Sequence, residues 1–233
     1  MAGDGESKGP VVVLASGSPR RLELLEMLGI EPVVTTAEVD ETPRPGEPAT
    51  ELVSRLARRK AVAGWRHWVR SSLSDPTSTS EGSGWLVIAA DTVVERDGSV
   101  FGKPEGKVAA TQMLVGLSGN VHRVHSGVAV GLASAPDGPF EPLTSVETTN
   151  VFMRTLDPDL VDWYVATGEP LDKAGGYGIQ GKGSLLVDRI EGCYPNVVGL
   201  PLLLVDRLCR QVGWPLHRLS GRQPSLGTMG GRQ

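Results

Sequence analysis

Residues 85–95, WLVIAADTVVE, restrict the fold more than any other stretch of this chain. From Leu86 to Val94 apolar side chains occupy both alternating faces, which is typical of a central strand covered on both sides. Because strand patterns of this kind alternate with helical patterns along the chain, we expect an α/β or α+β domain built on a mixed sheet. With 233 residues and a hydrophobic content of 39%, the chain can bury a substantial core as one compact unit.

Periodicity and turn residues predict the remaining elements. Besides 85–95, we expect strands at 11–15, 31–36, 121–133, 146–155 and 183–192. We expect helices at 19–28, 48–63, 106–117, 157–167 and 200–212, and the sequence RDGS at 96–99 predicts a hairpin turn. Polar composition predicts a single domain at 11–218, a flexible loop inserted at 71–84, and disordered ends at 1–10 and 219–233.

Composition excludes several classes of protein. A net charge of -4 argues against a general nucleic-acid binder, which carries a broad basic surface. Cys193 and Cys209 lack partners at zinc-ligand spacing, so we expect buried free thiols rather than disulfides or a metal site. No apolar stretch approaches the roughly 18 to 20 residues that span a bilayer, and the polar N-terminus is unlike a signal peptide. We therefore expect a soluble cytoplasmic protein with no membrane or nucleic-acid partner.

Asp91 interrupts the central apolar strand. A buried carboxylate is costly unless it is paired, hydrogen-bonded or bound to metal, so Asp91 needs a partner. A local role, in which Asp91 caps the end of the strand, explains a single aspartate equally well. The balance moves toward a functional site because other polar residues lie in apolar or glycine-rich settings, namely Lys60, Lys103, Asp172, Lys173 and Gln180.

The sequence SGSPRR at 16–21 places two cations where a helix should begin. Ser18 is a good N-cap and Pro19 suits the first helical position. Arg20 and Arg21 then lie near the positive end of the helix dipole, where a cation is unfavourable and an anion is favoured. A phosphate could bind there to free N–H groups, hydroxyls and guanidinium groups together. Two solvated surface arginines are an equally good explanation of these six residues alone.

Five glycines between 175 and 183 exceed what one turn requires. Glycine permits positive φ and a close approach of the backbone to a ligand, so this segment could cradle a phosphate or a base. A flexible hairpin explains the composition as well, because no phosphate-binding fingerprint is matched. His122 and His125 are interpreted as ordinary strand residues, and Glu41 lies in a polar loop where carboxylates are usually solvated.

Several motifs, taken in order, resemble the Maf family of nucleoside triphosphate pyrophosphatases. They are LASGSPRRLELLEMLG, EVDETPRPGEP, RLARRKA, AADTVV, GKPEG, LSGNVHRVHSGVAV, EPLDKAGGYGIQG and NVVGLPL, and they span roughly residues 11–212. The resemblance implies an elongated mixed central sheet flanked by helices, with a cleft between two lobes, related to the inosine triphosphate pyrophosphatases. It implies hydrolysis of a nucleoside triphosphate between the α and β phosphates with a divalent metal (Mg, Mn or Co), and a homodimer.

The resemblance also implies roles for individual residues. Asp91 corresponds to the family's proposed general base, and Glu41 and Asp91 to metal ligands, although the sequence leaves open whether Asp91 deprotonates water or mainly holds metal. The implied substrate-binding residues are Ser16, Arg21, Lys60, Lys103, Asp172 and Lys173. Arg20, Thr92 and Gln180 occupy the positions associated with substrate choice, in the combination of the dTTP/UTP subfamily. The branch that prefers 7-methyl-GTP typically has tryptophan in place of Arg20 and glutamate in place of Gln180.

Three other functions stay open at this point. The family's link to septum formation allows a non-enzymatic regulator of cell division, against which the intact catalytic set argues. A purine-directed pyrophosphatase acting on inosine, xanthosine or 7-methylguanosine triphosphate is a second alternative, and a pure nucleotide-binding module is the third. Product identification separates all of them. The sequence does not decide between removal of non-standard nucleotides and control of nucleotide pools.

Overall fold

A computed structural model describes residues 9–72 and 84–221 of the chain. Within these residues a seven-stranded mixed sheet has the order β2-β1-β3-β5-β6-β7, and the short β4 pairs with the end of β3. β1 is parallel to both of its neighbours, and the remaining pairs are antiparallel. The strands are β1 Val11–Ala15, β2 Val33–Thr35, β3 Trp85–Arg96, β4 Ser99–Phe101, β5 Val121–Ala133, β6 Leu143–Met153 and β7 Val187–Glu191.

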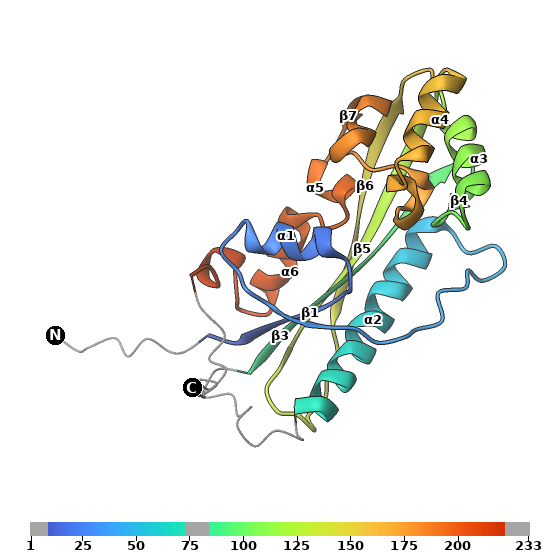
Figure 1. The fold of residues 1–233 in the computed structure, drawn as a ribbon. Coiled ribbons are helices and arrows are strands. Elements are labelled where there is room, and N and C mark those ends of the chain that lie inside the picture. Colours follow the sequence, from blue (N-terminus) through green and yellow to red (C-terminus); the bar gives the residue numbers. More distant parts are fainter. Residues whose placement is uncertain (1–8, 73–83, 222–233) are drawn as a thin grey trace, which may run out of the picture.

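Helices cover both faces of this sheet, as the apolar pattern of β3 requires. The long α2 lies along one face and α1 and α6 lie against the other, while α3 and α4 lie at the end of the molecule away from the two termini (Figure 1). The α-helices are α1 Pro19–Glu26, α2 Ala49–Ser72, α3 Lys107–Leu117, α4 Pro158–Ala166, α5 Tyr194–Val198 and α6 Leu202–Gln211. Four 3₁₀ turns complete the part of the fold that the structure describes: η1 Glu169–Asp172, η2 Ala174–Gly176, η3 Gly181–Leu186 and η4 Leu216–Arg218.

β3 contributes to four clusters of buried apolar side chains and joins two lobes. One face of its first half, up to Ala90, packs with α1 and α6, and the other face packs with α2. The end of the strand, at Val94, packs with α3 and α4. Asp91 and Thr92 lie between these points, so the middle of the strand reaches the junction of the two lobes. The mixed α/β sheet with two lobes confirms the expected fold class.

Most expected elements are present, with different ends. α2 continues to Ser72, beyond the expected end at 63, because Trp65 and Trp68 extend its apolar stripe toward Trp85. β7 begins only at Val187, since residues 181–186 form η3 instead of strand. The hairpin between β3 and β4 is confirmed, with Asp97 and Gly98 at positive φ. β4, α5 and the 3₁₀ turns were not expected.

The expected boundaries of the polar segments were partly wrong. Ser71 and Ser72 belong to α2 rather than to a flexible loop. Leu219 is only 2% exposed, and the N–H of Gly221 donates to the carbonyl of Gly29, so the ordered chain extends beyond 218. Pro10 is buried, and the carbonyl of Gly84 accepts from the N–H of Val11, so the expected disorder is also wrong for the end of 1–10 and the expected loop is wrong for its last residue. Residues 1–8, 73–83 and 222–233 lie outside the described residues. Cys209 is buried and Cys193 half-buried, and both are free thiols. None of the described helices is long and apolar enough to cross a membrane.

Candidate active site

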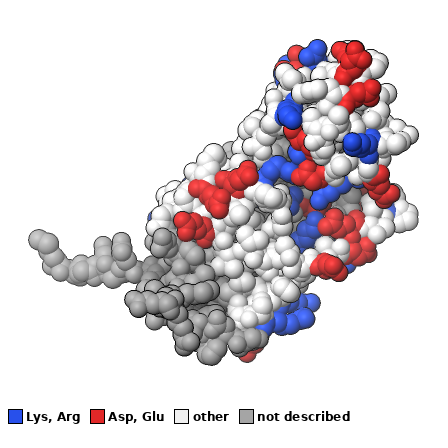
Figure 2. Space-filling view, viewed as in Figure 1, with Lys and Arg blue, Asp and Glu red and all other residues white. Residues whose placement is uncertain are grey.

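A cleft of about 450 Å³ lies where the two lobes meet. Five basic and three acidic side chains line it, and Figure 2 shows charged side chains gathered around the hollow in the middle of this face. Ten of the residues expected from the sequence line this one cleft: Arg20, Arg21, Glu41, Lys60, Asp91, Thr92, Lys103, Asp172, Lys173 and Gln180. The eleventh, Ser16, lies behind Arg21, to which it is hydrogen-bonded.

Asp91 has the partner that its burial requires. Its carboxylate projects from β3 toward α2, where Lys60 Nζ lies 2.5 Å from Asp91 Oδ1. The same ammonium group lies 2.7 Å from Glu41 Oε1. The Asp91 side chain is 8% exposed and that of Glu41 is 59% exposed. Lys60 therefore neutralises both Asp91, at the floor of the cleft, and Glu41, at its mouth. Because Asp91 pairs with a side chain of a different element, the interpretation of Asp91 as a local cap is wrong.

Arg21 is a buried cation bound mainly by the protein itself. Its Nε donates to the carbonyl of Gly199 at 2.9 Å, and Nη1 donates to Ser16 Oγ at 2.9 Å and to the carbonyl of Ala90 at 2.8 Å. Nη2 donates to Thr92 Oγ1 at 3.2 Å. Burial lowers the pKa of Arg21, although the charge of Asp91 acts in the opposite direction. The carbonyl oxygens of Gly199 and Ala90 thus offset the unfavourable interaction between Arg21 and the positive end of the α1 dipole.

Ser16 and Ser18 act differently from the capping pattern expected. Ser18 is the N-cap residue of α1, but its side chain makes no capping hydrogen bond. Its backbone N–H instead donates to Ser16 Oγ at 3.3 Å. Ser16 Oγ therefore accepts from both Ser18 and Arg21, and it orients the guanidinium group at the start of the helix.

Arg20 points across the cleft to the other lobe. Its Nη1 donates to Asp172 Oδ2 at 2.7 Å, and Lys173 Nζ lies 2.7 Å from Asp172 Oδ1. Burial alone would raise the pKa of Asp172, but hydrogen bonds from Lys173 and Arg20 lower it to about 2. Asp172 thus holds two cations of the cleft. Lys103 is exposed and has no ion-pair partner among the described residues.

Three residues of this region were not identified from the sequence, namely Tyr177, Ser126 and Glu169. Tyr177 lines the cleft, and its hydroxyl lies 2.6 Å from Nε2 of the buried His122. Burial lowers the pKa of His122 to about 4, so this histidine is neutral near pH 7. Ser126 Oγ lies 2.8 Å from Thr92 Oγ1. His122, which faces inward from β5, was the sequence signal that could have indicated Tyr177, because a buried imidazole needs a hydrogen-bond partner. No sequence pattern indicated Ser126 or Glu169.

The fold and the cleft define a two-lobed α/β protein whose cleft, lined by five basic and three acidic side chains, is chemically suited to a polyanionic small molecule. The family model described as Maf-like protein matches residues 11–212, and the chain belongs to this family. The protein of Chromobacterium violaceum named dTTP/UTP pyrophosphatase is 44% identical over 205 residues, covering 88% of this chain and 96% of the relative. The protein of the same name from Moorella thermoacetica is 48% identical over 197 residues, covering 84% and 92%.

Another protein named dTTP/UTP pyrophosphatase, from Acetivibrio thermocellus, is 45% identical over 202 residues and covers 87% of this chain and 95% of its own. A solved structure, that of the Staphylococcus aureus Ham1 protein, aligns over 90% of this chain and 86% of its own. It has 12% identity and a TM-score of 0.35, which is too low to carry an argument. Family membership therefore rests on the sequence relationships.

Proposed function

We propose that this protein is a nucleoside triphosphate pyrophosphatase that hydrolyses dTTP and UTP to the nucleoside monophosphate and pyrophosphate. The observation that carries the proposal is that ten residues expected from the family motifs meet in one cleft. The relatives named dTTP/UTP pyrophosphatase support the same activity, since they match over most of both chains.

The basic side chains of the cleft are suited to a triphosphate. Phosphoryl transfer needs cations around the phosphate oxygens, because negative charge is redistributed in the transition state. Lys103 has no ion-pair partner among the described residues, so it can bind phosphate without breaking a contact. Arg20 and Lys173 are held by Asp172, and they can turn toward a phosphate only if they exchange this carboxylate for it.

Asp91 is the proposed general base. Hydrolysis adds one water across the anhydride bond between the α and β phosphates, and the water must lose a proton as its oxygen bonds to phosphorus. Asp91 Oδ1 is bound to Lys60, whereas Oδ2 has no hydrogen-bond partner within the described residues. Oδ2 can therefore accept this proton while Lys60 fixes the orientation of the carboxylate.

Asp91 and Glu41 are the proposed ligands of a divalent metal. Within residues 9–72 and 84–221 no group of three histidine, cysteine, aspartate or glutamate side chains is placed to hold a metal ion. Two carboxylates meeting at one ammonium group nevertheless fit Mg²⁺, which binds one or two carboxylates together with substrate phosphates. Bound there, such an ion supplies positive charge to the phosphate oxygens.

Gln180 and Arg20 are the proposed readers of the base. The amide of Gln180 offers both a donor and an acceptor, which suits the edge of a pyrimidine. Thr92 is a less direct candidate, because its hydroxyl is already bound to Arg21 and Ser126. Its methyl and hydroxyl groups still line the cleft and limit its shape.

Pyrophosphate release from a panel of dTTP, UTP, CTP, GTP, 7-methyl-GTP and ITP tests this function. We expect dTTP and UTP to be the best substrates, with monophosphate and pyrophosphate as the only products. Inorganic phosphate as the first product would contradict the bond assignment. A preference for 7-methyl-GTP or ITP would contradict the base assignment, and binding without turnover would leave only a nucleotide-binding module.

A homodimer and a cytoplasmic location are proposed on the resemblance alone. A light-scattering mass in solution that equals a single chain would contradict the dimer, and fractionation of cells tests the location. The link to septum formation has the same basis, and it is tested by whether an inactive variant retains the effect on cell division.

A further inference from the structure

The glycine-rich segment 175–183 lines the cleft with its residues 177–180, and Gln180 is one of them. Gln180 is exposed and extended, with φ -90° and ψ 164°, and its amide makes no hydrogen bond within the described residues. Its position therefore depends on how the backbone is held on either side.

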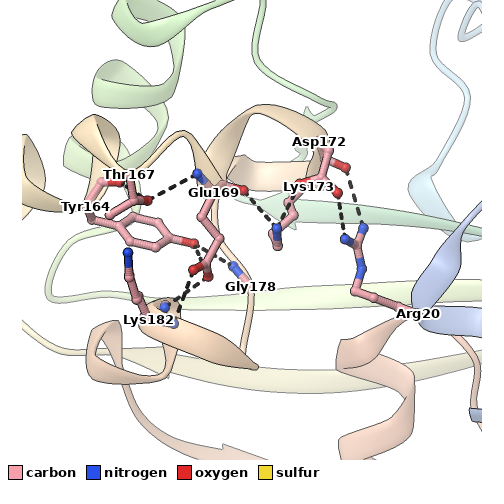
Figure 3. A network of polar contacts seen from close by, with 9 residues as sticks. Arg20, Tyr164, Thr167, Glu169, Asp172, Lys173, Gly178 and Lys182 are labelled. Carbon is pink, nitrogen blue, oxygen red and sulfur yellow. Dashed lines mark hydrogen bonds and ion pairs between the residues drawn. The ribbon is translucent and has the colours of Figure 1, made fainter. Parts of the chain in front are cut away.

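Glu169, at the start of η1, holds that backbone on one side (Figure 3). Its Oε2 accepts from the N–H of Lys182 at 3.2 Å, and its Oε1 accepts from the N–H of Gly183 at 3.1 Å. Oε1 also accepts from the hydroxyl of Tyr164 at 3.1 Å, and this hydroxyl accepts from the N–H of Gly178 at 3.1 Å. Gln180 thus lies between two anchored points.

Two glycines of the segment are required by this close approach. A Cβ on Gly183 would lie 2.2 Å from the carbonyl oxygen of Gly178 and 2.7 Å from the Tyr164 hydroxyl. Gly181 has φ +65°, and a Cβ there would lie 3.2 Å from Glu169 Oε2. The segment is therefore packed against Glu169 and Tyr164, unlike a flexible hairpin.

The same network reaches Arg20. Lys173 Nζ donates to the backbone carbonyl of Glu169 at 2.8 Å and contacts Asp172 Oδ1 at 2.7 Å. Asp172 Oδ2 in turn accepts from Arg20 Nη1 at 2.7 Å (Figure 3). Arg20 is therefore linked through Asp172 and Lys173 to the backbone of Glu169, whose carboxylate anchors the segment that carries Gln180.

We propose that Glu169 is a positioning residue that holds Gln180 in place in the cleft, which Arg20 also lines, and thereby sets the preference for the base. This inference rests on the proposed function. The carboxylate is needed because three donors converge on it, and an amide in its place would turn an NH₂ group toward at least one of them. Glu169→Gln keeps the shape of the side chain and releases the segment that carries Gln180.

The test compares kcat/KM for UTP and dTTP with kcat/KM for CTP and GTP in the full-length protein. We expect the ratio of UTP to CTP to fall about tenfold in Glu169→Gln, with kcat for UTP changed less than about threefold, because loss of a charged acceptor displaces the base-reading segment. Glu191→Gln is the matched control, since this exposed carboxylate on β7 lies outside the cleft and, among the residues that the structure describes, forms an ion pair only with Arg189. Its ratio should equal that of the wild type.

A double variant separates positioning from a general structural effect. If Glu169 acts through Gln180, Glu169→Gln should change base preference little in a Gln180→Ala background. Hydrogen exchange should also show faster exchange at the N–H groups of Lys182 and Gly183 in Glu169→Gln, with the rest of the sheet unchanged. Tyr164→Phe removes the hydroxyl that accepts from Gly178 and donates to Glu169, but it keeps the contacts of Glu169 to Lys182 and Gly183, so it should shift the preference in the same direction by a smaller factor.

The outcomes distinguish this inference from the proposed function. Wild-type base ratios in folded Glu169→Gln overturn the inference and leave the activity intact, as does an equal effect with and without Gln180. If Glu169→Gln does not fold, the ratio in Tyr164→Phe decides. A wild-type protein that releases no pyrophosphate, or that shows no base preference, overturns both the proposed function and the inference.

Discussion

Lys60 Nζ lies 2.5 Å from Asp91 Oδ1, and this contact joins α2 to β3 at the floor of the cleft. The two side chains are 18% and 8% exposed, so little water screens the pair. Lys60 also pairs with Glu41 at the mouth of the cleft. The strand can therefore carry a carboxylate in its apolar middle because a lysine from the neighbouring helix neutralises it.

Asp91→Asn should lower turnover strongly and leave the fold intact. The amide keeps the size of the side chain but cannot take a proton from water, and general-base catalysis contributes about 10² to 10⁴ in rate. We expect kcat for UTP to fall by about that factor, measured as pyrophosphate release. Asp188→Asn, an exposed change on β7, is the control and should keep full activity. Turnover within about tenfold of the wild type would exclude Asp91 as the base.

Lys60→Met should destabilise the protein by about 1 to 3 kcal/mol, because it leaves Asp91 without its partner. The double variant Lys60→Met with Asp91→Asn should lose less than the sum of the two single changes. Urea unfolding of the three variants measures this coupling free energy.

The matched comparison for Lys60 is the exposed pair Arg58 and Glu141, whose side chains are 49% and 77% exposed. Its coupling should stay below about 1 kcal/mol, as for other surface pairs. If the coupling of Lys60 with Asp91 is as small, the buried pair has no special role in stability.

Two helical glycines should respond to alanine with opposite signs. A Cβ on Gly64 in α2 would lie 2.5 Å from Ala15 Cβ, so Gly64→Ala should cost about 1 to 3 kcal/mol of stability through overpacking. A Cβ on Gly116 in α3 would meet no atom closer than Phe101 Cε1 at 4.0 Å, so Gly116→Ala should gain about 0.5 to 1 kcal/mol from helix propensity. Thermal or urea unfolding measures both. Stabilisation by both changes would show that α2 can move away from β1.

The strands and the need of Asp91 for a partner could be predicted, because both depend on local apolar pattern and on the cost of burying charge. Lys60 was identifiable as a polar residue on a helical segment, but its contact with Asp91 follows from the packing of α2 on β3. The 3₁₀ turns at 169–186 were missed because glycine-rich sequence has no clear period.

The arrangement around Arg21 could not be predicted. The helix dipole suggested that a bound anion would stabilise the arginines of SGSPRR, but Arg21 is hydrogen-bonded to the carbonyl oxygens of Ala90 and Gly199 instead. Backbone carbonyls carry no signature in the side-chain pattern, and Gly199 lies 178 residues away in the chain. The two arginines could be separated in role only by the family resemblance.

Arg21 and Arg20 should differ when each is replaced by lysine or alanine. Arg21→Lys keeps the charge but cannot satisfy four acceptors in a fork, so stability should fall by about 1 to 3 kcal/mol and all substrates should be turned over more slowly. Arg20→Ala removes a partly exposed pair, so stability should change by less than about 1 kcal/mol. Its effect should fall on the ranking of substrates. An equal loss for every substrate in both variants would contradict this division.

His122 should make the protein less stable as the pH falls from about 6.5 to 4. Burial lowers its pKa to about 4, below the ordinary value of 6.5, so the unfolded chain takes up the proton first. The stability is complete above pH 6.5 and falls by about 2 to 3 kcal/mol toward pH 4. His122→Gln should reduce this loss in urea unfolding at pH 7, 5.5 and 4, whereas the exposed His67→Gln should keep it. The same pH dependence in both variants would assign the loss to other groups, such as His125, whose pKa burial also lowers.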